Sequence, residues 1–294
     1  MVTMPLASPP ASPDASSALR PAHPDAAPAI AAPQGLVEAW RERRLFARVE
    51  AFCMFIGYQR SGHSLVGALL DAHPEAVIAH ELGALALFEQ GMGRRDLYRR
   101  ILQNAREFAG RGANPRPGYE LMVPGGSQGR FTRLRVIGDK TGGESTKVLI
   151  AEPDIVLRLE QKLRVPVRII HVVRNPYDNI ATLHRWRRNK GIKKLMPRHF
   201  ALVKANDKLR RRLGDRVMDV RHEDFVAHPR ERLAELCRFV GLEPTPDYLE
   251  ACAQIVFASP HQSRHEVEWP PKLRTKVDSR IARYDFLAGY SFDE

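Results

Sequence analysis

The chain has 294 residues, of which 44% are hydrophobic and 27% charged, and its formal net charge at pH 7 is +12. This length suits one large α/β domain better than two full domains. No stretch reaches the roughly 18 apolar residues of a membrane span, and prolines interrupt every candidate for a signal peptide. We therefore expect a soluble protein without a transmembrane segment, cytoplasmic in location.

The N-terminal residues differ in composition from the rest of the chain. Residues 1–34 contain ten Ala and eight Pro, with no periodic pattern that could bury one face. The predicted organisation is a disordered segment at 1–35 followed by a single domain at 36–294. Cys53, Cys237 and Cys252 are too scattered for a disulfide framework or a zinc site, which fits a reducing compartment.

Short apolar runs alternate with helical patterns along the rest of the chain. We predict strands at 52–56, 77–79, 134–138, 167–173 and 217–220. Helices are predicted at 64–72, 82–90, 96–109, 154–163, 178–189, 198–213, 229–240 and 247–257, with a long loop or irregular hairpin at 110–129. This alternation predicts an α/β fold: a doubly wound, mainly parallel sheet of about five strands flanked by helices, P-loop NTPase-like. Ligands of such sheets bind beyond the carboxyl ends of the strands.

The segment after the first predicted strand, Gly57 to Ser64, reads GYQRSGHS. It fits the phosphate-binding pattern G-x-x-x-x-G-K-[ST] except that His63 stands in place of the lysine. Backbone amides and a helix N-terminus can hold a phosphate without that lysine. Hydrolysis of a nucleoside triphosphate uses the lysine, so the pattern disfavours an ordinary ATPase or GTPase. The alternative is a Gly-rich turn that binds no ligand.

The residues Arg60-Ser61-Gly62-His63-Ser64 resemble the 5'-phosphosulfate loop of sulfotransferases that use 3'-phosphoadenosine 5'-phosphosulfate (PAPS). In that family the loop reads Lys/Arg-Ser-Gly-Thr/Ser-Thr/Ser, and only His63 departs from it. The resemblance implies PAPS as the sulfuryl donor, PAP as the product and no required metal. It implies that Arg60 stabilises charge on the leaving phosphate, while Ser61, Gly62, His63 and Ser64 hold the 5'-phosphate.

A second loop follows the fourth predicted strand. Arg174 ends that strand and Thr182 comes eight residues later, just over two helical turns away. This pair resembles the family's 3'-phosphate site. Near the C-terminus, Ser263-Arg264 and Trp269 resemble the loop that closes over the same phosphate, which implies Arg264 as a further ligand. The alternative for the pair is a structural Arg174–Asp178 ion pair, with Thr182 as a helix residue of no special role.

Two further segments resemble the family. Residues 219–242 are similar to its Tyr-Glu-Asp-Leu segment with the ensuing helix, which implies an architectural role in which Glu223 or Asp224 fixes nearby loops. Residues 138–141 look like its Asp-Lys-Ser/Thr strand end. By that likeness Lys140 reaches the sulfonate or the acceptor pocket and is a candidate catalytic residue, although a surface lysine would fit the sequence equally well.

In-line sulfuryl transfer needs a general base to take the proton of the acceptor hydroxyl or amine. The second predicted strand ends at His80-Glu81, and some family members resemble this with a strand-end glutamate as the base. We favour Glu81, with His80 second. The alternative is that one of them caps the following helix, since a carboxylate near a helix N-terminus is favourable in any case.

Two other functions are compatible with parts of the sequence. One is an unusual P-loop kinase, which would need magnesium and a substitute for the lysine. The other is a nucleic-acid or polysaccharide binder, because residues 185–216 hold thirteen Lys/Arg against Asp207 and Asp215; a solvated helix face explains the same run. We expect a small-molecule, glycan or lipid acceptor and no specific nucleic acid, while the acceptor and the oligomeric state stay open.

Overall fold

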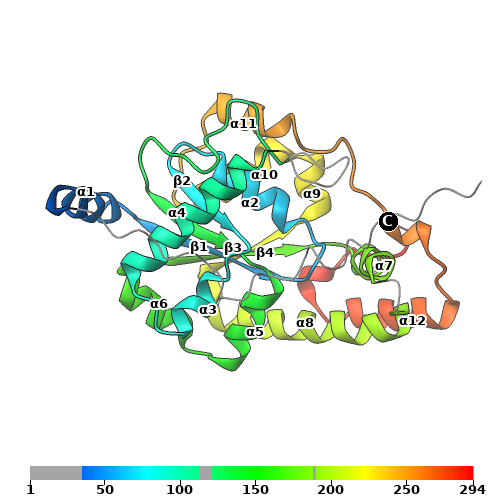
Figure 1. Ribbon diagram of the computed structural model, residues 1–294. Coiled ribbons are helices and arrows are strands. Elements are labelled where there is room, and N and C mark those ends of the chain that lie inside the picture. The colour runs from blue at the N-terminus through cyan, green and yellow to red at the C-terminus, as the bar shows by residue number, and fades with distance from the viewer. Residues whose placement is uncertain (1–34, 113–120, 188–189, 294) are drawn as a thin grey trace, which may run out of the picture. The chain divides into compact units, whose positions relative to one another are not determined.

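The computed structural model describes residues 35–112, 121–187 and 190–293. The predicted disorder of the N-terminal segment falls on residues that lie outside this range, as does part of the predicted 110–129 loop. The strands are β1 (Ala51–Gly57), β2 (Ala76–His80), β3 (Val136–Lys140), β4 (Val167–Val173) and β5 (Val217–Arg221). All neighbours pair in parallel, in the order β2-β3-β1-β4-β5. The predicted parallel, doubly wound α/β sheet is confirmed (Figure 1).

The helices surround this sheet. They are α1 (Leu36–Phe46), α2 (His63–Asp71), α3 (Ala84–Glu89), α4 (Arg94–Gly110), α5 (Gly143–Ala151), α6 (Ile155–Leu163), α7 (Pro176–Trp186), α8 (Ile192–Leu213), α9 (His222–Ala227), α10 (Pro229–Val240), α11 (Pro246–Ala253) and α12 (Pro271–Ile281). A short 3-10 turn, η3 (Ser263–Glu266), lies against α7.

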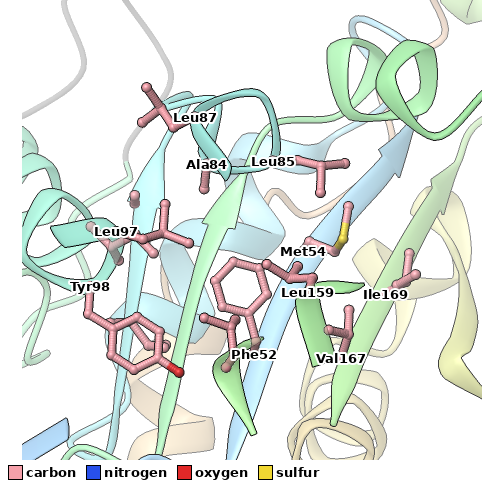
Figure 2. Close-up of a cluster of buried hydrophobic side chains, with 14 of the residues drawn as sticks. Phe52, Met54, Ala84, Leu85, Leu87, Leu97, Tyr98, Leu159, Val167 and Ile169 are labelled. Carbon is pink, nitrogen blue, oxygen red and sulfur yellow. The ribbon is translucent and has the colours of Figure 1, made fainter. Parts of the chain in front are cut away.

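Both faces of β1 are buried, as its continuous apolar run predicts. Side chains alternate along a strand, so the two faces join different cores. Phe52, Met54 and Ile56 pack with residues of α3 to α6, whereas Cys53 and Phe55 pack with residues of α2, α10 and α11. Figure 2 shows the first of these cores. The central strand is thereby fixed on both sides, which fixes the loop at its carboxyl end.

Several helices differ from the prediction. α1, α5, α9 and α12 were not predicted, and α8 begins at Ile192 rather than 198, continuing through Pro197. Leu195 and Met196 are buried against residues of α7 and α12, so tertiary packing outweighs the helix-breaking tendency of the proline. α12 begins at Pro271, with Pro270 as its N-cap, and a proline at the first helical position is a typical start signal.

All three thiols are free and buried. Burial raises the pKa of Cys237 and of Cys252 to about 12 and raises that of Cys53 further. They are therefore protonated, unreactive core residues at neutral pH. None of the described helices is both long and apolar enough to cross a membrane.

Candidate active site

The loop between β1 and α2 has an unusual backbone. Gly57, Arg60 and Gly62 all have positive φ angles, of 137°, 70° and 100°. Gly62 occupies the cap position of α2 and has no side chain to bond the first amides of the helix. Because the N-terminus of a helix carries positive charge, these amides are suited to an anion, and phosphate binding here stays a prediction. The loop therefore has the backbone that phosphate binding requires.

The side chain of His63 is directed into the protein beneath this loop. Its Nε2 lies 2.9 Å from the Ile56 carbonyl and its Nδ1 lies 3.0 Å from Ser61 Oγ. Burial lowers the pKa of His63 to about 4, so the ring is neutral at pH 7. Nε2–H then donates to the Ile56 carbonyl, and Nδ1 can only accept. The Ser61 hydroxyl has one hydrogen and two acceptors within reach: Nδ1 of His63 and the Tyr58 carbonyl oxygen at 2.9 Å. The ring of His63 thus stabilises the loop through hydrogen bonds. Only the backbone amide of His63 is available to bind an anion.

A buried polar network holds the start of the same loop. The Tyr58 hydroxyl lies 2.9 Å from Nε2 of His171 on β4, and Nδ1 of His171 lies 2.8 Å from Asp219 on β5. Arg210 of α8 donates to both oxygens of Asp219 at 2.8 Å. One cation of the basic run therefore has an internal, structural role.

The second predicted loop lies beside the first, because β4 is paired with β1. Nη1 of Arg174 donates to the Arg60 carbonyl at 3.1 Å, and Nη2 donates to the carbonyl of His261. The amide of Asn175 donates to Glu223 at 2.9 Å, in agreement with a loop-fixing role for Glu223. Arg174 thus connects the first loop, the second loop and residues 261–264, which we call the C-terminal segment.

The alternative of an Arg174–Asp178 ion pair does not describe this structure. Asp178 pairs instead with Arg264, at 2.6 Å from Nη1 and 2.8 Å from its backbone amide. Nε of Arg264 donates to Phe292 at 2.8 Å, and the residue is 1% exposed. The guanidinium of Arg264 therefore anchors the C-terminal segment on α7, and its part in phosphate binding stays a prediction.

Thr182 lies on α7 below this segment. Its hydroxyl donates to Ser263 Oγ at 2.9 Å, and Nδ1 of His261 lies 2.9 Å from the same oxygen. The structure thus places Arg174 and Thr182 on one loop-helix unit, both in contact with residues 261–263. Ser263 belongs to the segment that resembles the family's closing loop, whereas His261 was not predicted as a site residue, since nothing in its local pattern links it to α7.

A second group of polar side chains gathers where β2 and β3 end. Nζ of Lys140 lies 2.9 Å from Oε1 of Glu81, 3.2 Å from Ser64 Oγ and 3.4 Å from Nε2 of His80. The side chain of Lys140 is 3% exposed, whereas that of Glu81 is 68% exposed. Lys140 is therefore no surface lysine: it joins Ser64, at the start of α2, to the two candidate bases.

The backbone around Glu81 is held by the neighbouring strand. Glu81 has a φ of 57°, which is uncommon for a residue with a side chain. The carboxylate of Asp139 accepts the amides of Leu82 at 3.1 Å and Ala84 at 2.8 Å, and Thr141 accepts that of Gly83 at 3.2 Å. Asp139 was not predicted as a site residue. An acidic residue at the end of an apolar strand, directly before Lys140, is the sequence feature that could have indicated it.

The other candidate base, His80, is packed more closely. Its ring stacks on Phe108 of α4, with 3.9 Å between the centroids and 7° between the planes. Its backbone amide donates to Asn104 at 2.7 Å. Stacking fixes the ring, so His80 is less free than Glu81 to approach a substrate.

Arg60 contacts an aromatic residue that the sequence did not single out. Its guanidinium lies over the ring of Trp186 at 4.0 Å, and Trp186, the last residue of α7, is 47% exposed. Nη2 of Arg187 donates to Gln59 at 3.0 Å. The end of α7 thus orients the side chains of the first loop, because a cation is attracted to an aromatic face.

The chain is similar to known proteins in sequence and in structure. Residues 167–247, from β4 to α11, match a family model described as the Sulfotransferase family. No curated protein matches the chain. The sulfotransferase domain of the Synechococcus PCC 7002 olefin synthase is 18% identical over 81% of this chain and 96% of that one, with a TM-score of 0.46. Mouse sulfotransferase SULT7A1 complexed with PAP is 12% identical over 80% and 84%, with a TM-score of 0.43.

A third structure carries the fold comparison. The sulfotransferase domain of the curacin biosynthetic pathway is 15% identical over 80% of this chain and 98% of that one, with a TM-score of 0.50. The resemblance found in the sequence is therefore confirmed: residues 167–247 carry the pattern of the Sulfotransferase family, and the sheet and its helices have the fold of a sulfotransferase domain.

Proposed function

We propose that this protein is a PAPS-dependent sulfotransferase, which transfers a sulfuryl group from PAPS to a hydroxyl or amine of an acceptor molecule. The observation that carries the proposal is the hydrogen bond from Arg174 to the Arg60 carbonyl. It joins the two loops that we propose as anion sites, which follow the adjacent strands β1 and β4. A donor with phosphates at both its 3' and 5' positions needs two such sites, whereas a nucleoside triphosphate needs one.

The residues of the two loops fit a donor of this kind. The amides at the start of α2 would hold the 5'-phosphate, and Arg174 with Thr182 would hold the 3'-phosphate. Arg60 would neutralise charge on the leaving phosphate, with Trp186 setting the direction of its guanidinium. The donor supplies the sulfuryl group, and the protein supplies fixed positive charge where negative charge develops.

The chemical step requires one proton acceptor. The acceptor's oxygen or nitrogen forms a bond to sulfur, and the bond between sulfur and the phosphate's bridging oxygen breaks with its electron pair left on PAP. We assign the acceptor's proton to the Glu81 carboxylate, which is exposed and directed by Lys140. Lys140 also contacts Ser64, so it lies between the base and the phosphate loop and can stabilise the charge that moves between them.

The donor assignment can be tested by calorimetric titration of the full chain with PAP and, separately, with Mg-ATP. We expect PAP to bind at least about tenfold more tightly, because only PAP places a phosphate in each site. Arg174→Ala should weaken PAP binding by about tenfold or more. Tighter binding of Mg-ATP would contradict the proposal and favour a kinase.

The base assignment needs turnover measurements with labelled PAPS and an acceptor found by screening. Glu81→Gln should lower kcat by about 100-fold or more, with PAP affinity within about twofold of the original. Glu89→Gln, at an exposed glutamate on the following helix, is the matched control and should change neither. If Glu81→Gln and His80→Ala both retain near-normal turnover, the base lies elsewhere.

A further inference from the structure

The basic run at residues 185–216 divides into two sets of cations in the structure. Some of them are neutralised by carboxylates of the same chain: Arg210 pairs with Asp219, and Arg216 pairs with Glu160 at 3.0 Å. Lys204, Lys208 and Arg212 form no ion pair with any carboxylate in the described part of the chain, and all three are exposed. The proposed donor site uses none of these three, so their function is unexplained.

These three cations border a groove between α5 and α8. The groove has a volume of about 580 Å³. Its remaining lining residues are all apolar: Leu149, Ile150, Ala201, Ala205 and Leu209. The two helices lie against each other in Figure 1. Ile150 is 51% exposed, so the apolar lining of the groove reaches the surface of the protein.

The groove has the properties of a binding site for a helix. Lys204, Lys208 and Arg212 are spaced four residues apart on α8, so about 6 Å separates each from the next along the helix axis. Carboxylates on a partner helix repeat at the same interval. The alanines of α8 leave space for apolar side chains of that helix, which would cover Ile150.

We propose that this groove binds an acidic amphipathic helix of a partner protein. Charge complementarity selects the acidic face, and the apolar lining selects a helix with a hydrophobic stripe. A nucleic acid fits less well, because its phosphates need a polar and basic surface throughout. A membrane surface would favour protruding apolar side chains over a groove. The proposal does not depend on the sulfotransferase assignment, since no residue of the groove belongs to the donor site.

The test uses the full chain and a synthetic, fluorescein-labelled peptide of about 18 residues, with leucines at helical spacing and glutamates on the flanks. Fluorescence anisotropy should show saturable binding that weakens by about tenfold between about 50 mM and 500 mM salt. A peptide with lysine in place of every glutamate should not bind. Equal binding of both peptides, or binding of neither, would overturn the proposal.

A pair of charge-reversal variants locates the contact. Lys204→Glu with Lys208→Glu should weaken peptide binding by about tenfold or more. Lys272→Glu with Lys276→Glu makes the same change at the same spacing on α12, where the lysines are also exposed, and should leave binding unchanged. Ile150→Glu should weaken binding through the apolar lining. Circular dichroism of each variant establishes that it is folded, and equal losses in both lysine pairs would contradict the proposal.

Two further probes separate other classes of partner. Duplex DNA and vesicles containing phosphatidylserine are titrated against the full chain and the Lys204/Lys208 variant. We expect neither to compete with the acidic peptide at physiological salt. If either binds through these lysines while the peptide does not, the groove serves a nucleic acid or a membrane, and the proposed helix partner is wrong.

Discussion

Lys140 reaches the candidate bases only because Gly67 leaves room for it. A Cβ atom added at Gly67 would lie 2.7 Å from Cγ and 2.9 Å from Cβ of Lys140, closer than such atoms approach in proteins. The methylene stem of Lys140 therefore runs across α2 at the position of this glycine, and its ammonium emerges beside Ser64. A glycine inside a helix lowers the stability of the helix by about 1 kcal/mol relative to alanine. At this position it makes room for the buried Lys140 side chain.

We predict that Gly67→Ala lowers turnover while PAP binding changes little. The added methyl group displaces the Lys140 stem and with it the contact to Glu81, whereas the amides at the start of α2 stay in place. The expected decrease in kcat is about tenfold or more. Gly143→Ala is the matched control, because its Cβ would lie at an ordinary 3.6 Å from the Gly57 carbonyl. Steady-state kinetics measures kcat, and titration with PAP measures its Kd. A rise in the PAP Kd without a change in kcat would contradict this role for Gly67.

At the level of elements, the turn between β2 and α3 is held by β3. β2 and β3 pair in register, so that His80 lies opposite Lys140 and Asp139 lies opposite Ala79. The Asp139 carboxylate, buried at 3% exposure, accepts two amides of the turn and the Thr141 hydroxyl. Burial raises its pKa, an effect that these donors partly offset. One strand thus positions the turn on which Glu81 lies.

Replacing Asp139 by Asn should disturb this turn without disturbing the donor loops. The side-chain nitrogen of Asn donates and cannot accept, so it cannot replace the carboxylate oxygen that takes one of the two backbone amides, and that buried donor is left unsatisfied. That costs about 1–3 kcal/mol of unfolding free energy. We expect kcat to fall and the PAP Kd to stay within about twofold.

Asp154→Asn is the control for that experiment, since the carboxylate of Asp154 forms no capping hydrogen bond in α6. Urea denaturation gives the stability difference, and kinetics gives kcat and KM. A loss of stability with normal kcat would assign Asp139 to the fold alone.

The elements that the sequence predicts well are those with a strong local signal. β4 and α10 have the bounds that their apolar patterns indicate, and the two loops that were singled out from glycine and arginine positions do follow the adjacent strands β1 and β4. The side-chain roles of Asp139 and Trp186 could not be predicted, because each depends on contacts between segments far apart in sequence. The role of His63 depends on the loop folding back over its side chain, which the local pattern does not specify. The start of α8 was missed for the same reason.

Across the whole molecule, buried histidines make stability depend on pH. Burial lowers the pKa of His63 to about 4 and that of His199 and His222 to about 3. An unfolded chain titrates its histidines near pH 6.5, so between that pH and about pH 4 it binds protons that the native protein excludes. Stability is therefore lost as pH falls through this window. Asp71 acts in the opposite sense, because burial raises its pKa to about 7.

We predict that His199→Leu makes the pH dependence less steep. Both ring nitrogens of His199 are without a hydrogen-bond partner in the described structure, so at pH 7.5 the variant should be about as stable as the original. Between pH 6 and pH 5 its unfolding free energy should fall by less, the difference being at most about 1.4 kcal/mol. Urea denaturation at each pH measures this. Replacing the exposed His265 is the control, and parallel curves for the original and His199→Leu would show that His199 does not contribute.

Burial of all three cysteines has a practical consequence for labelling. Because no thiol of the chain is on its surface, a cysteine introduced in place of Ile150 would be the one site that a maleimide dye reaches in the native protein. A dye there would report directly on occupancy of the groove. The same reagent also reaches the native thiols whenever the core opens, so their slow modification would measure how often the sheet separates from its helices.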